Sequence, residues 1–228
     1  KADGTGSLTV PANTGTLVTT DASGNVGIGT SSPTKPLHIY GNTSNNHQIR
    51  LQNDFGSGAD WTLNAYGANG TLYVGNNLDR LLIDSAGRVT MPYQPSFLVG
   101  FGATNTISLT DGSLIEFDND SAGIAFDNGN NFDTSGGNHR FTAPITGTYF
   151  FNLTVKCSTV GNFSGTLKVN GSNANIVDAP VGFSSSNDSC VTTLVMQLNA
   201  NDYVQAFTRN GNYQLYKGHT FWSGFLIG

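Results

Sequence analysis

Acidic residues gather in one glycine- and asparagine-rich stretch of the sequence. They are Glu116, Asp118, Asp120, Asp127 and Asp133. Carboxylates on a loop are the oxygen ligands that Ca²⁺ prefers. The run that starts at Asp118 nevertheless fails the EF-hand pattern at its fifth ligand and has no glutamate at its twelfth position. The stretch therefore predicts either a weak calcium site, with Asp118, Asp120 and Asp127 as candidate ligands, or a solvated loop.

The sequence contains none of the common catalytic motifs. It contains no GxSxG, HExxH or CxxC pattern, and the glycines near Gly27 and Gly29 do not form a nucleotide-binding fingerprint. The four histidines (His38, His47, His139 and His219) are scattered. We therefore expect no enzyme activity and no organic cofactor. A polysaccharide depolymerase is the enzymatic alternative, because two carboxylates could meet across a subunit interface.

Composition favours many short strands joined by tight turns. Only 11% of the 228 residues are charged, against about 25% in an average soluble domain. The chain has 29 Gly, 14 Phe and 8 Tyr, which suit turns and strands. Its net charge of −5 disfavours nucleic acid as a partner. No apolar run approaches the roughly 18 residues of a membrane span, and because the chain starts at Lys1 we expect further chain upstream.

A repeat marks the first ninety residues. Asp21-Ala-Ser-Gly-Asn-Val26 recurs as Asp84-Ser-Ala-Gly-Arg-Val89, each time after a short β-prone run. Both copies predict a strand, a tight turn and a second strand. Strands with one or two large apolar residues each cannot close a core alone. We therefore expect this region to be an obligate oligomer.

The two prolines of Met91-Pro-Tyr-Gln-Pro95 predict a boundary between two domains, residues 1–92 and 93–228. Alternation is clear in Thr148-Tyr-Phe-Phe-Asn-Leu-Thr-Val155, as expected for a strand with one buried face. The spacing of turns predicts a sandwich or jelly roll. Its expected strands are residues 96–101, 106–109, 139–143, 147–156, 165–169, 175–179, 190–198, 203–208 and 220–227.

The first region resembles modules of bacteriophage tail fibres and tail spikes. The resemblance rests on Gly24-Asn-Val-Gly-Ile-Gly-Thr-Ser-Ser-Pro33 followed by Leu37-His-Ile39, and on Gly6-Ser-Leu-Thr-Val-Pro11. It covers roughly residues 4–92. Related modules also occur in bacterial surface proteins, so the resemblance implies an extracellular fibre stalk of either origin.

The second region resembles the C1q/TNF-like domain. The matching residues are Phe141-Thr-Ala-Pro-Ile-Thr-Gly-Thr-Tyr-Phe-Phe151, Asn201-Asp-Tyr-Val204 and Thr220-Phe-Trp-Ser-Gly-Phe-Leu-Ile227. The resemblance implies a ten-stranded jelly roll that trimerises, and in some relatives calcium near the threefold axis. The expected fold class is thus all-β: a short-stranded trimeric fibre or stalk module followed by a C1q/TNF-like jelly-roll β-sandwich. The segment from Glu116 to Asn138 is longer than the family pattern.

Binding is expected at the end of the sandwich away from the stalk. Counting antiparallel strands back from the last one places the loops Arg209–Gly218, Val181–Ser189 and Cys157–Phe163 there, with part of Glu116–Asn138. Aromatic rings and amide or charged groups together suit sugars. The candidate receptor-binding residues are Arg209, Asn212, Tyr213, Tyr216, Lys217, Phe183, Asn187 and Asp188. The alternative is that Tyr213 and Tyr216 pack the loop or the trimer seam.

Two cysteines, Cys157 and Cys190, are too few for a disulfide scaffold and lack metal-site spacing. They are either buried thiols or, because the C1q-like arrangement makes their strands neighbours, a disulfide. The resemblances together predict a homotrimeric distal protein of a virion tail fibre that contacts upstream fibre or tail proteins and binds a host cell-surface receptor, for which a polysaccharide is one candidate. The alternatives are a structural trimerisation cap and a bacterial surface or spore-filament protein.

Overall fold

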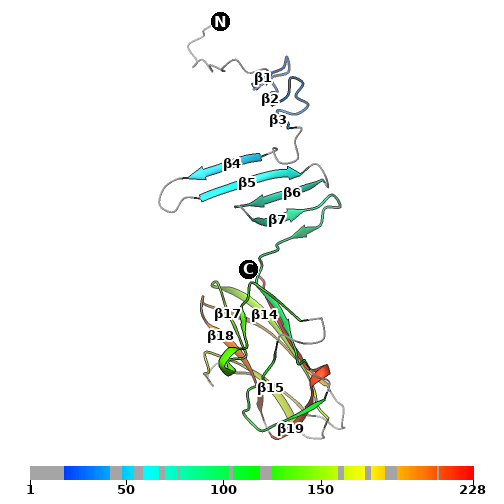
Figure 1. Cartoon of the computed structure of the whole chain (residues 1–228), viewed down its shortest axis with the longest axis vertical. Helices are drawn as coiled ribbons and strands as arrows, with labels where there is room; N and C mark the ends of the chain where they lie inside the picture. Colours follow the sequence, from blue (N-terminus) through cyan, green and yellow to red (C-terminus); the bar gives the residue numbers. More distant parts are fainter. Residues whose placement is uncertain are drawn as a thin grey trace. The chain divides into compact units, whose positions relative to one another are not determined.

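The structure is a computed structural model. It describes residues 18–41, 48–53, 59–66, 70–76, 78–102, 105–118, 125–158, 162–172, 176–182, 189–209 and 211–228. The chain forms two compact units, Lys1–Pro92 and Tyr93–Gly228 (Figure 1). Each unit is built from strands and turns.

The N-terminal unit begins with a small three-stranded sheet. β1 (Val18–Thr20) pairs antiparallel with β2 (Val26–Ile28), and β2 pairs parallel with β3 (Leu37–Ile39). The Asp21 carboxylate closes the β1–β2 turn by accepting hydrogen bonds from the backbone N–H groups of Ser23 and Asn25, at 2.8 and 2.9 Å. Gly24 takes the left-handed conformation that this turn requires, with φ of 81°.

A five-stranded antiparallel sheet follows in the same unit. Its strands are β4 (Gln48–Asn53), β5 (Ala59–Tyr66), β6 (Thr71–Gly75), β7 (Asp79–Ile83) and β8 (Val89–Thr90), paired in chain order. Asp84 repeats the role of Asp21 in the β7–β8 turn, where its carboxylate accepts hydrogen bonds from the N–H groups of Ala86 and Arg88 at 2.9 Å. The sequence repeat is therefore a repeated hairpin turn.

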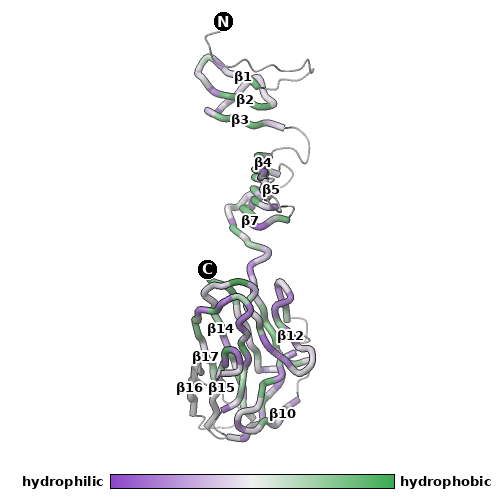
Figure 2. The backbone as a smooth tube through the Cα atoms, turned by 90° about the vertical axis from the view of Figure 1, so that its left-hand side faces the viewer, coloured by the Kyte–Doolittle hydropathy of each residue, from purple (hydrophilic) through white to green (hydrophobic). Residues whose placement is uncertain are grey.

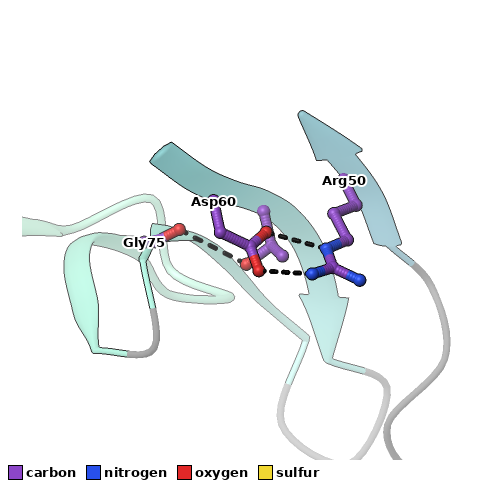
Figure 3. Close-up of polar contacts among 4 residues, drawn as sticks. Arg50, Asp60 and Gly75 are labelled. Carbon is purple, nitrogen blue, oxygen red and sulfur yellow. Dashed lines mark hydrogen bonds and ion pairs between the residues drawn. The ribbon is translucent and has the colours of Figure 1, made fainter. Parts of the chain in front are cut away.

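The two faces of this second sheet differ in an unusual way. Ile49 pairs with Leu63 and Leu51 with Trp61, so four large apolar side chains share one face. They are exposed, Leu51 by 68% and Trp61 by 40%. The opposite face carries the ion pair of Arg50 with Asp60, whose two hydrogen bonds measure 2.8 and 2.7 Å (Figure 3). Within the described residues, this apolar face is thus uncovered, although apolar side chains normally pack against a second layer.

The C-terminal unit packs two five-stranded sheets face to face. The first, in the order β11-β9-β20-β14-β17, is antiparallel throughout. Its strands are β9 (Ser96–Val99), β11 (Phe126–Asn128), β14 (Gly147–Lys156), β17 (Ser189–Leu198) and β20 (Phe221–Leu226). We name it the first sheet of the sandwich; β14 and β17 run side by side in Figure 1.

The second sheet of the sandwich has the order β12-β13-β18-β15-β16. Its strands are β12 (Phe132–Asp133), β13 (Arg140–Thr142), β15 (Asn162–Val169), β16 (Ile176–Gly182) and β18 (Tyr203–Arg209). Figure 2 shows β15 and β16 as neighbours. A two-stranded sheet of β10 (Thr106–Leu109) and β19 (Tyr213–Tyr216) completes the unit, with 3₁₀ turns at Ser135–Gly137 and Lys217–His219.

The core between the two sheets is aromatic. Phe97 lies at its centre, and its ring centroid is 4.9 Å from that of Phe141 and 5.1 Å from that of Trp222. Along β14, Tyr149, Phe151, Leu153 and Val155 are fully buried, and the residues between them face outward. This alternation confirms the prediction of an all-β jelly-roll sandwich, because the period of two buries one face of the strand.

Several segments differ from the sequence prediction. The strand expected at 165–169 already starts at Asn162, and the strand expected at 175–179 spans Ile176–Gly182. The loop expected at Arg209–Gly218 contains strand β19, which pairs with β10 because Leu215 packs into the core with no exposed area. The segment Glu116–Asn138 holds two short strands, β11 and β12, and a 3₁₀ turn. The strand expected to start at His139 starts at Arg140, because His139 has a left-handed φ of 41°.

Candidate functional site

The two ends of the sandwich are distinct. Chain enters at Pro95, whose carbonyl accepts the Leu226 N–H at 3.0 Å, so the first and last strands meet at one end. At the other end β14 finishes opposite the start of β17, with Lys156 paired to Ser189. The Ser158 N–H donates to the Gln214 carbonyl at 2.8 Å. We call this second end, formed by residues 156–158, 189–190, 209 and 211–219, the far end.

Strand β19 fixes the central part of the far end. Leu215 forms a β-bridge with Cys157 and is completely buried, while Gln214 on the other face is exposed. The Gln214 side-chain amide donates to the Ser108 hydroxyl at 3.4 Å. The polar groups of this segment are therefore held on a strand, and a ligand would meet a preformed surface.

Tyr216 lies half-buried among charged and aromatic neighbours. The Lys156 Nζ lies 5.5 Å from the centroid of its ring. The His219 ring packs edge-on against it, at 6.3 Å between centroids. The Tyr216 carbonyl also accepts a hydrogen bond from the Thr220 hydroxyl at 2.9 Å. The Tyr216 ring thus already contacts other side chains of the same chain. This is what we expect if Tyr216 packs the loop and does not contact a receptor.

The other predicted contact residues divide into three groups. Asn212 is exposed and Lys217 is half-buried, with its Nζ 5.8 Å from the Phe101 ring centroid. Arg209 ends β18 and is half-buried. The Tyr213 backbone pairs with Leu109, but its side chain lies outside the described residues. Phe183, Asn187 and Asp188 also lie outside them.

Lys156, Ser158, Gln214 and His219 belong to the far end but were not among the sequence candidates. The sequence predicts Lys156 as the last residue of a strand, which the structure confirms, and gives no pattern that links His219 to a partner. The available signal was the alternation Tyr213-Gln-Leu-Tyr216, in which one apolar residue sits between polar or amphipathic ones. That pattern indicates a half-buried strand that displays Gln214.

The calcium candidates serve the local fold. The two oxygens of Asp127 accept the backbone N–H groups of Asn131 and Phe132, at 3.0 and 2.9 Å. Asp118 accepts the Gly102 N–H at 3.3 Å, and Asp120 lies outside the described residues. No group of three or more His, Cys, Asp or Glu side chains able to hold a metal occurs in the described part of the chain. The described carboxylates therefore act as loop acceptors.

Cys157 and Cys190 are buried free thiols in the structure. Cys190 pairs with Val155 across β14 and β17, so Cys157 lies two residues further along the same face. Burial raises the pKa of Cys157 to about 12, with a smaller contribution from nearby Cys190. Burial likewise raises the pKa of Cys190 to about 11. Such thiols are poor nucleophiles at neutral pH, because the reactive thiolate is not populated.

Residues 96–227 match the sequence profile of the C1q domain. The chain belongs to the C1q domain family. None of the curated proteins matches it. In the described residues, no helix of the C1q domain or of the N-terminal unit is long and apolar enough to cross a bilayer.

Solved structures similar to the C1q domain include members of the complement and TNF groups. The globular domain of zebrafish complement 1qA protein is 21% identical, with a TM-score of 0.43, over 59% of this chain and 98% of that chain. Murine APRIL at pH 5.0 is 13% identical, with a TM-score of 0.45, over 59% and 99%. Eiger TNF from S. frugiperda is 11% identical, with a TM-score of 0.41, over 59% and 94%.

One outward face of the C1q domain is apolar. On the first sheet, Phe225 pairs with Phe150 and Phe150 with Val195, so the three side chains form a row across neighbouring strands. Phe225 is 46% exposed and Val195 57%. Next to this row, the Asn152 side-chain oxygen is buried without a hydrogen-bond partner in the described part of the chain. An exposed apolar row beside a buried polar atom without a partner is typical of a surface that another protein covers.

Proposed function

We propose that this chain is the distal part of a virion tail fibre, a homotrimer whose C1q domain attaches to a receptor on the surface of a host cell. The far end, where Asn212, Gln214 and Tyr216 lie on or beside a fixed strand, is the receptor-contacting surface. A polysaccharide is the receptor class that such amide, hydroxyl and aromatic groups serve best, because each hydrogen-bonds or stacks with a sugar ring. The protein acts outside the producing cell and performs no catalysis.

Self-association is supported by apolar surface on both units. The row Phe225, Phe150 and Val195 offers a flat apolar patch on the C1q domain, and a second copy would supply a donor to the Asn152 oxygen. In the N-terminal unit, Leu51 and Trp61 lie on a sheet face that other copies would cover. Three copies that close around one axis would cover these faces and remove the exposed apolar area.

The observation that carries receptor binding is the position of the far end. It lies at the end of the sandwich opposite Pro95, where chain enters the C1q domain, and this supports a position at the tip of the proposed fibre. Three tips in one assembly would bind a repetitive surface together, and weak single contacts then give useful avidity. The module Gly24–Pro33, which resembles tail-fibre sequences, supports a phage rather than a secreted animal protein as the source.

A structural cap is the second candidate function. The Tyr216 ring already contacts Lys156 and His219, which is the packing expected if the far end only seals the trimer. In that case recognition belongs to other proteins of the particle, or the chain is part of a bacterial surface or spore filament.

A measurement of binding to cells distinguishes a receptor-binding tip from a structural cap. Labelled protein of verified assembly mass is added to candidate host cells before and after their surface polysaccharide is stripped. Variants Tyr213→Ala and Tyr216→Ala are compared with Tyr93→Ala, an exposed tyrosine at the opposite end. Loss of binding on stripping, and in the far-end variants alone, supports a glycan-reading tip. Equal binding by all three variants assigns recognition elsewhere and supports the cap.

A further inference from the structure

Cationic and aromatic side chains share the outward face of the second sheet of the sandwich. On β18, alternate residues Tyr203, Gln205, Phe207 and Arg209 are half-buried, while Val204 and Ala206 between them face the core. Arg140 of β13 and Lys168 of β15 both pair with Gln205, one on each side. Of the five Lys and Arg residues in Tyr93–Gly228 (Arg140, Lys156, Lys168, Arg209 and Lys217), three therefore lie on this face.

Each of the two flanking cations lies over an aromatic ring. The Arg140 guanidinium carbon is 4.7 Å from the Tyr203 ring centroid. The Lys168 Nζ is 4.2 Å from the Phe207 ring centroid. A cation over a ring face is held in place without losing its charge. The backbones of Arg140 and Lys168 lie about 10 Å apart, two strand spacings, with Gln205 between them. Their charged groups are held over two different rings of β18.

These two cations are not neutralised by carboxylates in the described part of the chain. Neither forms an ion pair there, and the Arg140 Nε is buried without a hydrogen-bond partner. Asp133, whose backbone pairs with Arg140, turns its carboxylate to its own loop, where it accepts the Ser135 hydroxyl and the Asn138 amide, both at 2.6 Å. Those hydrogen bonds, Ser135 first, lower the Asp133 pKa, and the Arg140 charge adds least. The Asp178 backbone pairs with Thr166 on the same face, and its side chain lies outside the described residues.

We propose that this face, built around Arg140, Gln205 and Lys168, binds an acidic polysaccharide. Arg140 has the planar fork that pairs with a carboxylate, and Lys168 supplies a point charge for the next one. Gln205 donates its amide to the Asn138 carbonyl at 2.7 Å, which leaves its side-chain oxygen to accept a sugar hydroxyl. The Tyr203 and Phe207 rings provide apolar surface beside the cations for the sugar faces.

This site is separate from the far end and does not depend on receptor binding there. If copies associate through the first sheet, as in the proposed function, the second sheet stays on the outside and repeats its site once per copy. A chain with a negative charge at each repeat would then engage more than one copy. The net charge of −5 acts against broad attraction of polyanions, so binding relies on the two placed cations.

The test measures binding of length-matched glycans to the whole chain by calorimetry. The probes are alginate oligosaccharides, neutral malto-oligosaccharides and a single-stranded oligonucleotide with the same number of charges. We expect alginate to bind and the neutral sugar to bind at least about 10-fold more weakly. The double variant Arg140→Gln with Lys168→Gln should lose at least about 10-fold in alginate affinity, which corresponds to about 1.4 kcal/mol of binding free energy. Lys35→Gln, an exposed cation of the N-terminal unit, should change nothing.

Several results would overturn the proposal. They are equal affinity for alginate and the neutral sugar, equal or tighter binding of the oligonucleotide, and unchanged alginate affinity in the double variant. Phe207→Leu keeps both charges and should weaken alginate binding less than the double variant does. An unchanged unfolding midpoint verifies that each variant is folded. Tyr216→Ala should leave alginate affinity unchanged. The test can therefore distinguish failure of the proposed receptor binding at the far end from failure of alginate binding at this face.

Discussion

Phe150 and Phe225 lie side by side on the outward face of the first sheet, with ring centroids 5.1 Å apart and ring planes 34° apart. Their backbones are paired as well, on β14 and β20. A charge placed here would be desolvated by a second copy. We expect Phe225→Asp to reduce the assembly to single chains in sedimentation velocity. Ile145→Asp, equally exposed in the turn before β14, should keep the assembly mass. An unchanged mass in Phe225→Asp would place the interface elsewhere.

Gly224 sits where the aromatic core leaves no room for a side chain. A Cβ at this position would lie 2.6 Å from Phe151 Cδ1 and 2.8 Å from Phe97 Cε1. We expect Gly224→Ala to lower the free energy of unfolding by about 1–3 kcal/mol, as overpacking does. Chemical denaturation measures the change. Gly228→Ala, where a Cβ meets nothing within 4 Å, is the matched control and should unfold like the unaltered protein.

Asp84 organises the β7–β8 turn through hydrogen bonds to its carboxylate. The Arg88 backbone N–H contributes most to the lowered pKa of Asp84, followed by the Arg88 side chain and the Ala86 N–H. We expect Asp84→Ala to speed amide exchange at Arg88, and to leave Asn25 in the other copy of the turn unaffected. A uniform change at both turns would show that the two sheets of the N-terminal unit unfold together.

The same carboxylate gives the turn a pH dependence. Because the folded pKa of Asp84 is lowered, its stabilising contribution is present above the ordinary pKa of 3.8 and is lost as pH falls through the lowered value. The unaltered protein should therefore approach Asp84→Ala in thermal stability as the solution is acidified below pH 3.8. A stability difference that persists in strong acid would contradict the role given to the carboxylate.

The buried thiols predict the opposite pH dependence. Their folded pKa values, about 12 for Cys157 and about 11 for Cys190, exceed the ordinary value of 9.0. Stability linked to the protonated thiols is present below pH 9.0 and is lost as pH rises through the folded values. We expect slow labelling by a thiol reagent at pH 8 and fast labelling after unfolding. Cys157→Ala should flatten the alkaline fall in unfolding free energy.

The disulfide hypothesis has its own measurement. Reduction of the protein should leave its intact mass unchanged if Cys157 and Cys190 are thiols, as in the structure. A mass increase by a pair of hydrogen atoms would establish the disulfide, and would require it to form outside a reducing cytoplasm.

Local patterns predicted the sandwich well, and long-range pairs limited the prediction of the site. The alternation in Thr148–Val155 reports which face of β14 is buried, so the sequence alone places Tyr149 and Phe151 in the core. Strand β19 shows only one four-residue alternation, and its partner β10, more than 100 residues earlier, cannot be identified from that local pattern. The two-residue strand β12 is too short to show a period. Lys156 reaches Tyr216 only through such pairings, which no local signal carries.

The alternation of β14 also constrains how the protein can change over time. Tyr149, Phe151 and Leu153 face the core, while Phe150 and Asn152 face outward. Inserting or deleting one residue in β14 would exchange the two sets beyond that point, which would expose core rings and bury the polar groups. Divergence along this strand is therefore expected as substitution at constant length. Variation in length should instead accumulate in the connections between strands.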